Sequence, residues 1–193
     1  MAFQGYTQQT VDFMWGIRFN NERGWFLEHK DDYINTFLTP TKELGEQVYD
    51  AVHALLPDEP LMLKVSRIYR DARRLFGRGP YKDHLWWCIR TGDKDWTGRP
   101  TFWFELGPDY YSFGLGFWSP AAALMETYRK QIDQHPEELS KLVRQFNKQS
   151  VFTLDGPEYA RSKGQTSNLL RPWYQKKSLS LRWEGPLDER IFT

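Results

Sequence analysis

The chain has 193 residues, 26 Lys and Arg against 25 Asp and Glu, and an aromatic content of 17 % that includes nine Trp. This length and this supply of bulky side chains predict a single domain, residues 1–193, with a packed core. The net charge of +1 argues against a general nucleic-acid binder, and no apolar run is long enough for a transmembrane helix. With one cysteine, Cys88, and no basic leader followed by an apolar run, we expect a cytoplasmic protein.

The first part of the chain, about residues 7–56, is predicted to be helical. Thr7 is a suitable cap for a first helix, Asn21 for a second, and Pro40 favours the first turn of a third. Apolar residues recur at helical spacing within each segment. The three predicted helices cover about residues 8–19, 21–37 and 40–56.

The middle of the chain, about residues 61–118, has the character of a sheet. A GPDY turn joins two strands whose opposite faces both carry aromatic side chains, which predicts a curved sheet or one covered on both faces. The predicted strands here are 64–71, 84–91, 101–106 and 110–118.

The last part, about residues 119–193, is predicted to be helical and mixed. Ser119-Pro120 and Pro136 are typical of helix starts. The predicted elements are helices at 120–134, 136–148 and 167–175, and strands at 152–154 and 178–183. Together the segments predict an α+β fold, with a mainly antiparallel, curved sheet of about four to six strands packed by the N-terminal helices and by the helix pair after Ser119.

Charge concentrates between Lys64 and Arg90. This segment holds eight of the basic residues and two of the acidic ones, so it carries +6 in a chain whose remainder carries −5. Arginine presents a planar fork that suits phosphate or carboxylate oxygens, and glycines at 77 and 79 let the backbone approach a ligand. The predicted ligand-binding residues are Arg67, Arg70, Arg73, Arg78, Tyr81 and Lys82.

The alternative for this segment is a solvated basic loop with one internal ion pair. If 64–71 is a strand, each of its faces carries an arginine, and an inward one needs a partner such as Asp71 or Glu105. His84, Asp71 and Glu105 are weak candidates for acid–base catalysis. His84 stands at a strand start near cations, and Glu105 has apolar neighbours. Asp71 is better explained as a structural partner that orients Arg70 or Arg73.

Amides and aromatics offer further candidates, each with a structural alternative. Asn20 and Asn21 could present amides to a ligand, or simply cap a helix that precedes a packed Trp-Phe pair. The pairs Tyr110-Tyr111 and Trp86-Trp87 could stack on nucleic-acid bases beside the cations, or pack in the core. Four scattered His residues have no zinc-site spacing, and no phosphate-binding glycine motif is present. The sequence therefore predicts no metal site and names neither a cofactor nor a reaction.

Three motifs occur in order along the chain. They are Asn20-Asn21-x-Arg23-x-Trp25-Phe26 with Lys30 and Tyr33; Arg70-Asp71-x-Arg73 with Arg78 and Pro80-Tyr81-Lys82; and Tyr110-Tyr111 with Gly114-x-Gly116 and Pro120. Together they resemble a family catalogued as domain of unknown function 2461. The resemblance implies a soluble, single-domain α+β protein and brings no established activity or cofactor. The chain departs from the family pattern at Arg74-Leu75, usually Phe-Ser, and at Gly77-Arg78, usually Asp-Lys, which makes this loop more basic.

These observations lead to three functional hypotheses. The first is a binding or enzyme-type pocket for a small molecule that bears phosphate or carboxylate. The alternatives are a nucleic-acid-binding module, which is less favoured by the charge, and a structural or interaction domain without a small ligand. No membrane partner is expected.

Overall fold

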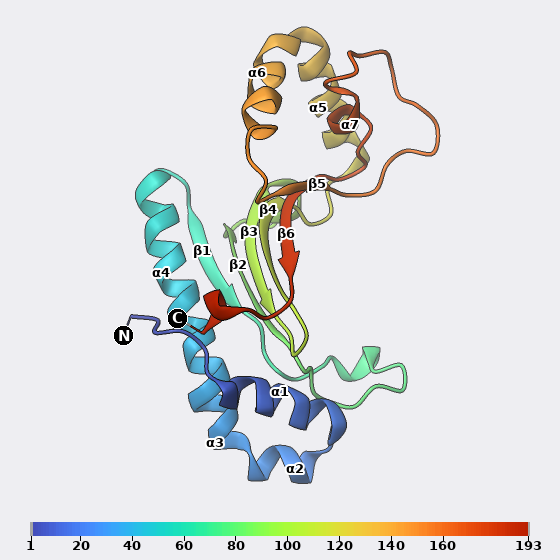
Figure 1. The fold of residues 1–193 in the computed structure, drawn as a ribbon. Coiled ribbons are helices and arrows are strands. Elements are labelled where there is room, and N and C mark those ends of the chain that lie inside the picture. Colours follow the sequence, from blue (N-terminus) through green and yellow to red (C-terminus); the bar gives the residue numbers. More distant parts are fainter. Residues whose placement is uncertain (1, 193) are drawn as a thin grey trace. The chain divides into compact units, whose positions relative to one another are not determined.

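The computed structural model describes residues 2–192. Within them, six strands form one antiparallel sheet in the order β1-β2-β3-β4-β6-β5, with helices before the sheet in sequence and a helix pair after its fourth strand (Figure 1). The predicted α+β class and strand number are confirmed. The strands are β1 (Leu61–Val65), β2 (Leu85–Thr91), β3 (Pro100–Leu106), β4 (Tyr111–Phe117), β5 (Thr153–Asp155) and β6 (Ser180–Gly185).

The helices follow the predicted segments closely. None found in the described chain is long and apolar enough to cross a membrane. Helices α1 and α6 begin where the sequence predicts, whereas α5 begins two residues late and α7 is reduced to one turn. Their bounds are α1 (Gln8–Phe19), α2 (Arg23–Glu28), α3 (Lys30–Asp32), α4 (Thr39–Leu55), α5 (Ala122–Gln134), α6 (Pro136–Phe146) and α7 (Arg171–Tyr174).

The described residues form two compact units. The first contains residues 2–90, Trp103–Phe113 and 184–192, and the second contains Thr91–Phe102 and Gly114–Trp183. The single-domain organisation stays a prediction.

Pro40 lies in the first turn of α4, as the sequence predicts, but no break separates α4 from the helical residues before it. The chain passes from α3 through a π-helical turn, Tyr33–Leu38, directly into α4, which runs alongside β1 (Figure 1). Because proline has no N–H, Pro40 cannot donate to the carbonyl of Thr36 four residues earlier. The buried Thr10 hydroxyl of α1 donates to that carbonyl instead, at 2.6 Å. Pro40 therefore occupies the first turn of α4, and α1 supplies a donor to the Thr36 carbonyl.

The core of the first unit is built from aromatic side chains of the N-terminal helices. Phe13 of α1 lies with its ring centroid 5.7 to 6.2 Å from those of Trp25, Tyr33 and Phe37. Phe37 is fully buried. The second unit has a separate cluster on α5, α6, α7 and the residue before α7, made of Ile132, Val143, Leu170 and Tyr174. Each unit thus buries its own apolar side chains.

The strand predicted for residues 64–71 ends early, at Val65. The Ser66 hydroxyl accepts a hydrogen bond from the Trp86 N–H, and past this point the pairing is reduced to a bridge between Tyr69 and Tyr81. The predicted alternation nevertheless persists, because Ser66 and Ile68 are buried while Arg67 and Tyr69 are exposed. The basic segment therefore enters the first unit as an irregular extension of β1.

Candidate functional site

Two sequence motifs that lie 60 residues apart meet at Tyr81. The Asn21 side chain accepts a hydrogen bond from the Tyr81 N–H and donates one to the Tyr81 carbonyl, both at 2.9 Å. Asn21 was expected either to cap a helix or to face a ligand. The structure assigns it neither place, because the N-cap of α2 is Glu22 and both ends of the amide are used by Tyr81.

Gly79 makes this contact sterically feasible. A Cβ atom at residue 79 would lie 2.2 Å from Asn21 Oδ1, far inside contact distance. The Tyr81 ring stacks on Phe26, with centroids 4.3 Å apart, and is 4 % exposed. Burial raises the pKa of the Tyr81 phenol. Tyr81 therefore lies in the core. Because its backbone is held there, it fixes the position of the next residue, Lys82.

Arg70 is the inward arginine of the basic segment. Its Nε donates to the Tyr81 carbonyl at 2.8 Å, and its Nη2 lies 3.9 Å from Asp83 Oδ1. Its pKa is lowered by burial and by the nearby Arg78 charge. Asp71, expected as a partner of Arg70 or Arg73, is paired with Arg73 through two hydrogen bonds of 2.8 and 3.0 Å. The carboxylate near Arg70 is Asp83.

Asp83 is the centre of an ion-pair network that the sequence interpretation missed. Its carboxylate accepts from Arg18 Nε at 2.6 Å and from His84 Nδ1 at 3.0 Å, and Arg18 also pairs with Asp109. The His84 hydrogen bond, followed by that from Arg18, holds the Asp83 pKa well below its usual range. The one feature of the sequence that could have pointed to Asp83 is that it is an acidic residue within a basic segment. Asp71 has the same feature, so the sequence could not distinguish the two.

Lys82 is half-buried among like charges. Burial and the charges of Arg70 and Arg67 lower its pKa from 10.5 to about 8, and the Glu105 carboxylate opposes this shift. Its Nζ lies 5.7 Å from the centre of the Trp86 ring. An ammonium in this setting changes its protonation state within a pH unit of neutral solution, which is uncommon for lysine.

The three weak catalytic candidates have different surroundings. Glu105 accepts a hydrogen bond from the Tyr110 hydroxyl, where an arginine had been expected as its partner, and it lies within electrostatic range of Lys82. His84 bonds Asp83. Asp71 lies at the surface with Arg73. Glu105 and His84 thus border the Arg70–Lys82 region, whereas Asp71 does not share their contacts.

The remaining basic residues lie on the outside. Arg67 and Arg78 are exposed, and the Arg73 side chain is 88 % exposed. Arg78 Nε donates to the Leu75 carbonyl at 3.3 Å. The Arg74 side chain lies outside the described part of the structure. Between these residues, Phe76 is 83 % exposed and has a positive φ of 47°, unusual for a bulky residue.

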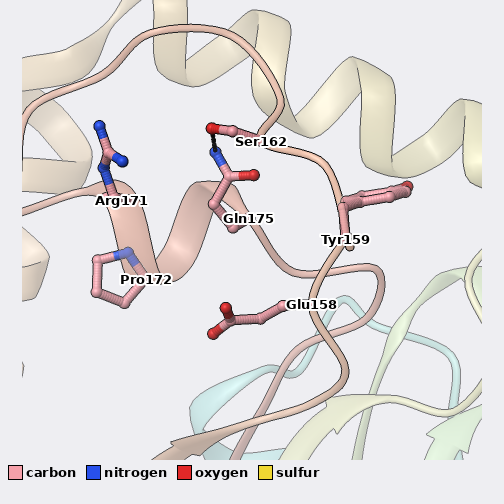
Figure 2. Close-up of a pocket in the computed structure, with 6 residues that line it drawn as sticks. All are labelled: Glu158, Tyr159, Ser162, Arg171, Pro172 and Gln175. Carbon is pink, nitrogen blue, oxygen red and sulfur yellow. Dashed lines mark hydrogen bonds between the residues drawn. The ribbon is translucent and has the colours of Figure 1, made fainter.

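The aromatic pairs divide between core and surface. Trp87 and Tyr111 are buried, so neither can stack on a base, while Trp86 is half-buried beside Lys82. Cys88 is buried as well. No group of three metal-ligating side chains occurs among residues 2–192. A described cavity lies elsewhere, in the C-terminal part of the second unit (Figure 2).

A family model described as conserved hypothetical protein (DUF2461) matches residues 9–185, which includes all three motifs quoted above. No curated protein matches the chain.

Proposed function

The chain belongs to the DUF2461 family of conserved hypothetical proteins, and we propose that its Arg67–Arg70–Lys82 cluster binds a phosphate- or carboxylate-bearing small molecule. The observation that carries the proposal is Lys82, a half-buried ammonium whose pKa is lowered to about 8 by burial and by two arginines. Arg78 lies near enough to lower the pKa of Arg70 as well. An anion at this position would relieve the repulsion among all four cations.

The carboxylates nearby neutralise the cluster only in part. Asp83 is shared among Arg18, His84 and Arg70, and Glu105 is engaged by the Tyr110 hydroxyl. The four cations therefore share two carboxylates, and Asp83 is also bonded by Arg18 and His84. Grouping like charges in a partly desolvated place costs free energy. A bound anion would remove part of this repulsion, so its binding would be favourable.

Ligand binding can be tested with inorganic phosphate and citrate, measured by calorimetry at low salt. We expect Lys82→Met and Arg67→Gln each to weaken binding about tenfold, the loss of one charge-assisted contact. Arg73→Gln is the matched control, because the Arg73 guanidinium is exposed and held by Asp71. If Arg73→Gln lost as much affinity as Lys82→Met, the anion would bind elsewhere on the basic segment. Absence of binding to wild type by either probe at millimolar concentration would contradict the proposal.

Exposed aromatic side chains favour single-stranded nucleic acid as a second candidate. Tyr69 lies within the cationic segment and is 57 % exposed, and Phe76 is more exposed still. A nucleic-acid site requires affinity that falls steeply with salt, since each phosphate contact releases a counterion. We expect Tyr69→Ala to weaken oligonucleotide binding without affecting citrate binding. Equal loss of both would exclude stacking as the cause.

A further inference from the structure

The residues from 156 to 178 form a second basic region, in the second unit. They contain five Lys and Arg against one acidic residue, Glu158. The segment folds back on itself, because the Tyr159 N–H donates to the Gln175 carbonyl and the Lys177 N–H donates to the Pro157 carbonyl. A cavity of about 350 Å³ opens between its two arms, lined by Glu158, Tyr159, Ser162, Arg171, Pro172 and Gln175 (Figure 2).

Gln175 holds the loop that forms one wall of this cavity. Its side-chain oxygen accepts from the Lys163 N–H at 2.8 Å, and its amide nitrogen donates to the Lys163 carbonyl at 2.9 Å. The same nitrogen lies 3.3 Å from the Ser162 hydroxyl, the contact dashed in Figure 2. The loop is therefore fixed in place before any ligand arrives.

Three cations surround the ring of Tyr159, which lines the cavity. Arg129 Cζ, Lys163 Nζ and Lys177 Nζ lie 5.0, 4.9 and 5.7 Å from the ring centroid. Each contact is favourable singly, but three like charges around one ring repel one another. Arg129 reaches the ring from α5, whereas the two lysines come from opposite arms of the basic segment.

The buried guanidinium of Arg129 gives independent evidence for a ligand, because one of its nitrogens has no hydrogen-bond acceptor within the described chain. The residue is 9 % exposed, and its Nη1 is buried without a hydrogen-bond partner within the described chain. The nearby carboxylates are in use, because Glu158 bonds Lys176 at 3.1 Å and Asp133 accepts from the Tyr174 hydroxyl at 3.0 Å. A buried guanidinium nitrogen without an acceptor is destabilising, so an acceptor from outside the chain would be bound favourably.

We infer that the Arg129–Lys163–Lys177 cluster around Tyr159 is a second anion site, which takes the phosphate or diphosphate group of a small molecule. A phosphate group carries up to two negative charges on three oxygens, so it can accept from cations that approach from different directions. A carboxylate has one charge and two oxygens and satisfies fewer of them. Tyr159 belongs both to this cluster and to the lining of the cavity.

The test uses inorganic pyrophosphate, followed by backbone amide NMR on the full chain. We expect the amide signals of Tyr159 and Lys163 to shift on titration. Lys163→Gln and Lys177→Gln should each raise Kd about tenfold, which is the loss of one charged contact. Lys141→Gln removes the same charge from an exposed position on α6 and should change Kd less than twofold. These three lysines are exposed, so the variants are expected to fold.

A second measurement separates a ligand site from a purely structural cluster. In a Lys82→Met background, where the site of the first unit is weakened, pyrophosphate should raise the melting temperature, and adding Lys163→Gln and Lys177→Gln should abolish that rise. Shifts confined to amides around Lys82 would overturn this site and leave the one in the first unit standing. Unchanged affinity in both lysine variants, or no shifts at Tyr159 and Lys163 at millimolar pyrophosphate, would overturn it too.

Discussion

Asn21 holds the backbone of Tyr81 with two hydrogen bonds of 2.9 Å, across 60 residues of sequence. The amide side chain takes the place of a neighbouring strand, since it pairs with both the N–H and the carbonyl of one residue. The same carbonyl also accepts from Arg70 Nε. This contact therefore joins the helical start of the chain to the basic segment and sets the position of Lys82.

Removing the Asn21 amide should destabilise the fold. Asn21→Ala leaves the Tyr81 N–H without an acceptor in a partly buried place, so we expect a loss of about 2 kcal/mol in the free energy of unfolding, measured with urea. Asn20→Ala is the matched control, because the exposed Asn20 amide donates only to the Gly16 carbonyl and should cost about 0.5 kcal/mol. Equal losses in the two variants would contradict the assigned role of Asn21.

Gly79→Ala should destabilise the protein through the same contact. The new methyl group would meet the Asn21 side chain at 2.2 Å, and we expect a cost of about 1–3 kcal/mol, as for overpacking. Gly24→Ala has the opposite expected sign, because position 24 lies in α2 with open space around it and alanine favours a helix by up to about 1 kcal/mol. In an Asn21→Gly background, which also removes the Asn21 Cβ that would lie 2.6 Å from the new methyl group, Gly79→Ala should cost much less. Additive losses would show that the two residues act independently.

Asp83→Asn should weaken the network around Arg18, Arg70 and His84. The Asp83 side chain is 18 % exposed, so we expect a loss of about 2 kcal/mol at pH 7, below that for a fully buried pair. Because the Asp83 pKa is lowered in the folded protein, this stabilisation is present above about pH 4 and is lost as the pH falls further. Asp71→Asn, at the exposed Arg73 pair, should change stability by less than about 1 kcal/mol. A wild-type acid-unfolding profile unchanged by Asp83→Asn would refute this prediction.

Lys82 should titrate with a midpoint near pH 8 in a ¹³Cε-lysine NMR experiment, since burial and its arginine neighbours lower its pKa. Between about pH 8 and 10.5 the unfolded chain holds a proton at this residue that the folded chain has released. Stability from this residue therefore rises with pH across that window, and Lys82→Met should abolish the rise. Added phosphate should move the midpoint upward if the anion binds there. A midpoint near 10.5 would refute the prediction.

Sequence patterns predicted the fold well where local signals agree. Helix α1 occupies the predicted residues 8–19, and β2 begins one residue after the predicted start. The errors occur where a distant residue overrides the local signal. The strand predicted from Lys64 to Asp71 ends at Val65, where the Ser66 hydroxyl accepts a hydrogen bond from the Trp86 N–H.

For the candidate site, the sequence by itself determined which charges are available and that an inward arginine of the predicted strand 64–71 would need a partner. Charge and strand alternation are local properties, so they can be read without the fold. Only the tertiary structure decided that Asp83 is that partner, that Asn21 holds Tyr81, and that Lys82 is half-buried among arginines. Each of these facts depends on which distant segments come together, and hydrogen bonding and desolvation act over a few ångströms in space regardless of separation along the chain.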